Sequence, residues 1–298
     1  MKKLFKKGLL FWPWLVGLSA LAPFNQAQAE PDQQIPVIEQ KMQQLYDIYQ
    51  QNQQFNGKTF RIFVAKPKAS SAQPLPVLYT LDANAQFPLA VNAVDANKTL
   101  PLIVGIGYDT DKAYAIELRT RDYTPAGQGE EFAKGGQAAD FLQFIRQQLK
   151  PWVEENYAID RQNQYFFGHS FGGLFGLYVL FNAPDLFQYY TIASPSLWWD
   201  NSRFLPAQKP WIAHSPKHIL LTLGEYEENP QADPNLNAEQ LKRIESRKQM
   251  RQLNAHQLAD ELQAQGEKVD FYLIPQQNHG GSIPYAIQAS VQWLQDHR

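Results

Sequence analysis

The chain has 298 residues, which suits one large domain with a sizeable hydrophobic core. Hydrophobic residues make up 44% of it and aromatic residues 13%, so the composition is that of a globular protein rather than a disordered one. The formal net charge is −2, and there is no cysteine. The absence of cysteine excludes disulfides, thiolate catalysis and cysteine-ligated metal sites.

The N-terminus has the features of an export signal. Four lysines precede an apolar run over residues 8–21, and an Ala-x-Ala site follows (Lys2, Lys3, Lys6, Lys7; Ala27–Ala29). The apolar run is shorter than the roughly 20 residues that a membrane-spanning helix needs. We therefore expect a signal peptide over residues 1–29, cleavage after Ala29 and a periplasmic protein. An uncleaved N-terminal anchor is the alternative.

The remainder, residues 30–298, is expected to form a single domain. Without the four lysines of the leader it carries 23 basic and 29 acidic residues, a net charge of −6. No basic stripe is evident, so nucleic acid is a poor match as a partner.

Strands and helices alternate along this domain. Alternating Phe60, Ile62 and Val64 predict a half-exposed strand, and continuous apolar runs predict buried strands at 76–81 and 102–106. A helix over 138–157, which Pro151 is expected to kink or split, precedes a strand at 164–167. A helix at 170–181, strands at 189–193, 218–223 and 269–274, a loop at 226–237, and helices at 238–265 and 283–294 complete the chain. The alternation predicts an α/β fold with a mostly parallel central sheet and helices on both faces.

The most specific motif is Gly168-His169-Ser170-Phe171-Gly172, which reads G-x-S-x-G. It lies between a predicted strand and a predicted helix, the context in which a tight turn presents a serine hydroxyl as a nucleophile. We therefore expect Ser170 to be the nucleophile. The alternative is a glycine-rich turn whose serine caps the helix.

A serine nucleophile needs a base, and the base needs an orienting acid. His279 lies between the last predicted strand and the last helix, where the order Ser…acid…His places the base. The acid is expected after the strand at 218–223. Glu227 is favoured there, Glu225 is close behind, and Glu228 or a serine–histidine dyad without an acid stays open.

The oxyanion hole requires two backbone amides. One is expected from Phe171, directly after the nucleophile. The other is expected from the loop after the strand at 76–81, and we choose Asn84, with Ala83 as the alternative.

The chain resembles the esterase D-like family of α/β-hydrolases, in particular siderophore esterases of the enterobactin and salmochelin type. Seven segments carry the resemblance in the right order: 77–82, 119–125, 135–136, 149–152, the elbow at 168–172, 194–199, and 224–227 with 278–280. They span about residues 60–294. Ala83 departs from the family, which usually has glycine after the aspartate. The resemblance implies the α/β-hydrolase fold and ester chemistry more firmly than it implies the substrate.

The resemblance also places the segment with Arg119 and Arg121 beside the active site, on a loop after a strand ending near Glu117. These arginines are expected to hold an anionic group, or, alternatively, to be surface residues paired with Asp122. Trp198 and Trp199 are adjacent, so one is expected in the core and the other free to stack on an aromatic ligand.

The first interpretation is an exported serine esterase that opens the ester bonds of a catecholate siderophore macrolactone. The alternatives are a general periplasmic carboxylesterase for small acyl or aryl esters, and a periplasmic ligand-binding protein with an inactive site. No resident cofactor or metal is expected, because iron, if involved, belongs to a ferric siderophore substrate.

Overall fold

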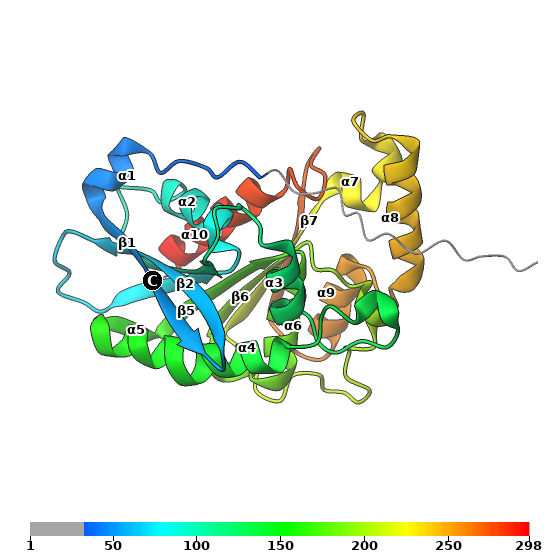
Figure 1. Ribbon diagram of the computed structural model, residues 1–298, viewed down its shortest axis with the longest axis horizontal. Helices are drawn as coiled ribbons and strands as arrows, with labels where there is room; N and C mark the ends of the chain where they lie inside the picture. The colour runs from blue at the N-terminus through cyan, green and yellow to red at the C-terminus, as the bar shows by residue number, and fades with distance from the viewer. Residues whose placement is uncertain (1–32, 298) are drawn as a thin grey trace, which may run out of the picture.

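The computed structural model describes residues 33–297, so the predicted signal peptide lies outside the described residues. An eight-stranded sheet runs through the middle of the molecule in the order β1-β2-β4-β3-β5-β6-β7-β8 (Figure 1). The six strands from β4 to β8 along this order are parallel, and β1 and β2 pair antiparallel at one edge. The strands are β1 Tyr46–Phe55, β2 Lys58–Pro67, β3 Leu75–Thr80, β4 Leu102–Tyr108, β5 Ile159–His169, β6 Tyr189–Ala193, β7 His218–Gly224 and β8 Val269–Ile274.

Helices cover both faces of the sheet. They are α1 Gln40–Leu45, α2 Ala83–Asn92, α3 Ile116–Tyr123, α4 Ala138–Phe144, α5 Lys150–Asn156, α6 Phe171–Asn182, α7 Glu225–Glu228, α8 Ala238–Met250, α9 Ala255–Ala264 and α10 Ile283–Asp296. None of the helices within residues 33–297 is long and apolar enough to span a membrane.

The sheet separates two hydrophobic cores because its side chains alternate between the faces. On β3, Val77 and Tyr79 join the core formed with α4, α6 and α9, whereas Leu78 joins the core formed with α1, α2 and α10. Both sets of side chains are fully buried. The predicted architecture, a mostly parallel sheet with helices on both faces, is therefore confirmed.

The antiparallel hairpin at the sheet edge was predicted only in part. Its turn is Asn56-Gly57, with φ of 49° and 75°, the left-handed pair that suits a tight hairpin. The sequence indicated the second strand but not the first. β1 reads Tyr-Asp-Ile-Tyr-Gln-Gln-Asn-Gln-Gln-Phe and has mostly exposed side chains, so it shows no alternation of apolar and polar residues.

Two helical predictions need correction. The segment with Arg119 and Arg121 is the helix α3, not a loop. The predicted helix over 238–265 is two helices, α8 and α9, because Asn254 accepts a hydrogen bond from the Gln257 amide and begins a new helix. The helix predicted at 138–157 is present as α4, a π-helical turn at Ile145–Leu149 and α5, and this irregular turn lies just before Pro151, where a kink or split was expected.

Candidate active site

Ser170 lies at the sharp turn between β5 and α6, with φ 60° and ψ −116°. A Cβ atom added to Gly168 would lie 2.2 Å from the Gly172 carbonyl oxygen, so only glycine fits at this crossing. The turn brings the Ser170 hydroxyl to the carboxyl end of the parallel strands. The strand, turn and helix that the motif predicted are thus present.

The Ser170 hydroxyl meets His279, which follows β8. The His279 Nε2 atom lies 2.9 Å from Ser170 Oγ, and its Nδ1 atom lies 2.6 Å from Glu227 Oε2. With its proton on Nδ1, the imidazole donates to Glu227 and accepts from the serine hydroxyl. The structure therefore brings together the three residues that the sequence favoured, in the geometry of a proton relay.

The Glu227 carboxylate is held from a second side. Its Oε1 atom accepts hydrogen bonds from the Ser194 hydroxyl at 2.6 Å and from the Gly224 amide at 2.9 Å. Burial alone would raise the pKa of the Glu227 carboxyl, but His279 and these two donors lower it below its ordinary value. Sequence reasoning assigned no role to Ser194, although its position directly after β6 is a signal that could have found it.

Glu225 and Glu228, the competing acids, face other partners. Glu225 Oε2 accepts a hydrogen bond from the Gln276 amide at 2.7 Å, and Glu228 is exposed. Glu225 therefore supports the loop that carries His279 without touching the imidazole.

The two predicted oxyanion donors differ in position. Phe171 follows Ser170 at the start of α6. Asn84 lines a different cavity, of about 500 Å³, and its side chain is bonded to the backbone of Tyr108 and Thr110. These contacts are made by the Asn84 side chain, and the role of its backbone amide stays a prediction. Ala83, the alternative, directly follows Asp82, whose carboxylate borders the elbow at Gly172.

Neither arginine of α3 is free to act as predicted. Arg119 lines the cavity beside Ser170, but its guanidinium makes a buried two-bond pair with the Asp82 carboxylate at 2.8 and 2.9 Å. Arg121 pairs with Asp122 at 2.7 and 2.8 Å and is not among the residues that line that cavity. For Arg121, the structure therefore shows the alternative from the sequence analysis, which is a pair with Asp122.

The adjacent tryptophans separate as their spacing predicted. Trp199 is fully buried, and its indole donates to the Pro125 carbonyl at 2.9 Å. Trp198 lines a cavity of about 400 Å³ that also contains Ser170, His279 and Glu227. Trp198 therefore borders the cavity, with the Arg247 guanidinium lying over its ring.

The far wall of the same cavity comes from α8, which sequence analysis did not connect to the site. Arg243, Arg247 and Lys248 on α8, and Arg251 just after it, line the cavity. Arg243, Arg247 and Arg251 recur every four residues, the spacing of one helix face, which could have revealed a basic stripe. The statement that the chain lacks a basic stripe is therefore wrong.

His169, inside the elbow, packs directly on the relay. Its ring centroid lies 4.6 Å from that of His279. Burial, together with the nearby His279 and Arg119, lowers the pKa of His169 well below its ordinary value. His169 is therefore neutral at physiological pH.

Comparison with known proteins shows which family the chain belongs to. A family model described as "Putative esterase" matches residues 53–269. The chain belongs to this esterase family. It is 36% identical over 208 residues to the ferri-bacillibactin esterase BesA of Bacillus subtilis (strain 168), covering 62% of this chain and 72% of that protein.

Solved structures agree with this family assignment. The BES protein from Bacillus cereus superposes with a TM-score of 0.68 at 27% identity, covering 88% of this chain and 98% of its own. The enterobactin hydrolase IroE in complex with DFP superposes with a TM-score of 0.64 at 25% identity, covering 85% and 96%. The protein thus has the α/β-hydrolase fold and is an esterase of the serine hydrolase class. Within residues 33–297, no three His, Asp or Glu side chains are grouped to hold a metal.

Proposed function

We propose that this protein is an exported serine esterase that hydrolyses the ester bonds of a siderophore, and specifically those of an enterobactin-type catecholate trilactone. The observation that carries the proposal is the chain of contacts from Ser170 through His279 to Glu227, in a cavity that Trp198 also lines. Relatives named for siderophore esters support the substrate class.

In the proposed reaction, Ser170 Oγ attacks the ester carbonyl carbon while His279 Nε2 takes the hydroxyl proton. Glu227 orients the imidazole and stabilises it once it is charged. The protonated His279 then gives its proton to the leaving alkoxide, and the acyl group stays on Ser170. A water molecule, deprotonated by His279, releases the acid and restores the serine.

The negative charge that develops on the carbonyl oxygen needs preorganised donors. We propose the backbone amides of Phe171 and Asn84, with Ala83 as the alternative for the second donor. The buried Arg119–Asp82 pair fixes the residue just before Ala83, so it acts by holding this loop in place.

Replacing Ser170 with alanine should lower kcat by about three orders of magnitude or more, because the nucleophile is removed. A fluorophosphonate should label the native protein at Ser170, with circular dichroism confirming that the variant is folded. Ser70→Ala, which alters an exposed residue, is the matched control and should label and react normally. Full activity in the Ser170→Ala protein would exclude the serine mechanism. A native protein that is folded but hydrolyses no ester would favour the ligand-binding alternative.

The substrate is tested by comparing kcat/KM for ferric and iron-free catecholate trilactones with that for simple aryl esters. A preference of tenfold or more for either trilactone supports the siderophore assignment. Equal or higher values for the aryl esters would instead identify a general carboxylesterase, the second candidate.

Export is proposed from the N-terminal lysines, apolar run and Ala-x-Ala site. Mass spectrometry of the protein recovered from the periplasmic fraction should find Glu30 as the first residue. Recovery of the intact chain from the membrane fraction would indicate an uncleaved anchor.

A further inference from the structure

The cavity around Ser170 is lined by more positive than negative side chains. Of the described residues that line it, five carry a lysine or arginine cation, and Glu227 carries the one carboxylate, which is already bonded to His279 (Arg119, Arg243, Arg247, Lys248, Arg251). The whole chain nevertheless has a net charge of −2. The positive charge is therefore local to this cavity, and four of the five cations come from α8 or the residue just after it.

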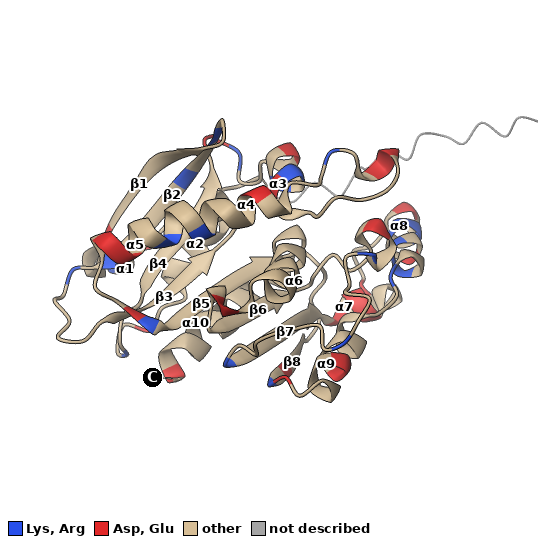
Figure 2. Ribbon diagram, turned by 90° about the horizontal axis from the view of Figure 1, so that it is seen from below, with Lys and Arg blue, Asp and Glu red and all other residues tan. Residues whose placement is uncertain are grey.

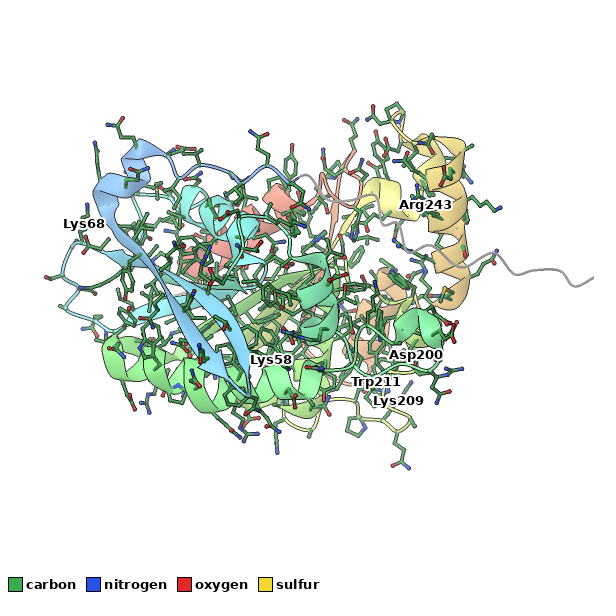
Figure 3. All side chains as sticks on the ribbon, in the orientation of Figure 1. Lys58, Lys68, Asp200, Lys209, Trp211 and Arg243 are labelled. Atoms are coloured by element: carbon green, nitrogen blue, oxygen red, sulfur yellow. The ribbon has the colours of Figure 1, made fainter. Side chains whose placement is uncertain are left out.

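α8 brings these cations to the cavity from the margin of the core. None of its residues is fully buried, although Met250 packs against the core, and the helix lies at the end of the molecule opposite the β1–β2 hairpin (Figures 1 and 2). Figure 3 labels Arg243 on this helix. Because a helix face repeats every three to four residues, Arg243 and Arg247 face the same side as Arg251.

The Arg247 charge forms no salt bridge in the described part of the chain, whereas its neighbour Arg243 pairs with the exposed Glu239 at 3.8 Å. The Arg247 guanidinium instead lies over the Trp198 ring, 4.6 Å from its centroid. Burial and the neighbouring Arg243 lower the pKa of Arg247, as expected for a cation that lacks an anionic partner.

Arg251 extends the same pattern. Burial lowers its pKa despite the opposing effect of Glu228, Glu227 and Glu245. Lys248, in contrast, is bonded to Glu245 Oε1 at 3.3 Å and to the Glu228 carbonyl at 3.1 Å. Arg247, over the Trp198 ring, and Arg251, which lines the same cavity, form no salt bridge among the described residues.

We propose that Arg247, Arg251 and the Trp198 ring form a subsite for an aromatic anion, which binds a negatively charged part of the ester substrate away from the scissile bond. The subsite rests on the proposed esterase function and assigns selectivity to residues of α8 rather than to Arg119 and Arg121. An aromatic ring packs against the stacked Arg247–Trp198 pair, and its anionic group accepts hydrogen bonds from the guanidinium groups of Arg247 and Arg251.

The test compares two aryl esters that differ in one charge, 4-nitrophenyl 4-carboxybenzoate and 4-nitrophenyl 4-methylbenzoate. Arg247→Met keeps the aliphatic contact with Trp198 and removes the charge. It should lower kcat/KM for the carboxylate ester at least tenfold, mainly by raising KM, and change that for the neutral ester less than twofold. Lys242→Met, an exposed α8 residue outside the cavity lining, is the matched control and should change neither.

Equal losses on both esters would overturn the subsite and make Arg247 a structural contact of Trp198. If Arg247→Met fails to fold, Arg251→Met provides the same comparison.

Direct binding separates this proposal from the esterase proposal. Calorimetry of the Ser170→Ala protein should show salicylate binding at least tenfold more tightly than neutral salicylamide. In the Ser170→Ala/Arg247→Met double variant, this difference in affinity should disappear. Equal binding of salicylate and salicylamide by the Ser170→Ala protein would overturn the subsite even if esters are hydrolysed. Selective salicylate binding in a protein that hydrolyses no ester would keep the subsite and reject the esterase.

Discussion

Glu225 and Glu227 lie two residues apart on the short helix α7 and have different partners. Glu227 meets the His279 ring, whereas Glu225 meets the Gln276 amide on the loop that carries His279. Both carboxylates therefore contact the loop that carries His279, but only Glu227 can orient the imidazole. Sequence spacing favoured Glu227 but left Glu225 open, because both follow the same strand.

Replacing Glu227 with glutamine should lower kcat by about 10³–10⁴-fold, because the amide favours the wrong imidazole tautomer and cannot stabilise the imidazolium. Glu225→Gln changes the matched neighbour and should lose less than about tenfold, since its amide oxygen can still accept from Gln276. Steady-state kinetics on one aryl ester measures both. A larger loss for Glu225→Gln would identify Glu225 as the acid, and small losses for both would indicate a dyad.

The neutral His169 should make stability depend on pH. Below about pH 6.5 the unfolded chain protonates this imidazole, whereas the folded protein, in which its pKa is lowered, does not. Protonation therefore favours unfolding, and this contribution to stability is lost progressively as pH falls below 6.5, by at most about 1.4 kcal/mol per pH unit.

His169→Asn removes this group and should flatten the decline of Tm between pH 6.5 and 5 relative to the native protein. His256→Asn, at an exposed histidine, is the control and should leave the slope unchanged. If Tm falls equally steeply with decreasing pH in the native and His169→Asn proteins, His169 is protonated in the folded state.

At the scale of elements, the sequence located the buried parallel strands well. Runs such as Leu102–Ile106 are apolar throughout because both faces of a central strand are covered, and few other structures produce that pattern. The nucleophile turn was equally clear, since a Cβ atom at Gly168 would lie 2.2 Å from the Gly172 carbonyl oxygen.

The elements that the sequence did not predict are stabilised by contacts that do not show in their pattern of apolar and polar residues. β1 is polar and forms by pairing along its whole length with β2. The break between α8 and α9 depends on side-chain caps, and each cap is a single residue in a polar stretch. The cavity wall formed by α8 could not be derived, because only the fold places it opposite Trp198.

The two caps should have unequal effects. Asn254→Ala removes the acceptor for the Gln257 amide and should destabilise the protein by about 1 kcal/mol, because α9 buries Leu258 and Leu262 in the core. Asn237→Ala removes the same kind of cap from α8, which has no buried residue. It should leave Tm nearly unchanged and speed hydrogen exchange in α8. Equal shifts in Tm would mean that α8 is part of the cooperative core.

For the whole molecule, one sheet connects the two cores, so the domain should stay assembled after a single cut. The exposed loop at 68–74 joins β2 to β3, and both of these strands pair with β4. Limited proteolysis should nick this loop first. The two pieces should separate on a denaturing gel but elute together, at the size of the intact protein, in gel filtration. Separate elution would show that residues 30–298 are not one domain.

The weak attachment of α8 has a consequence for evolution. The side chains that would choose among esters lie on a helix that contributes nothing buried, while the reacting side chains are held by the sheet and its loops. Substitutions on α8 can therefore accumulate with little loss of folding free energy. Descendants of this protein could change the ester they prefer through surface substitutions alone, with the same hydrolytic machinery throughout.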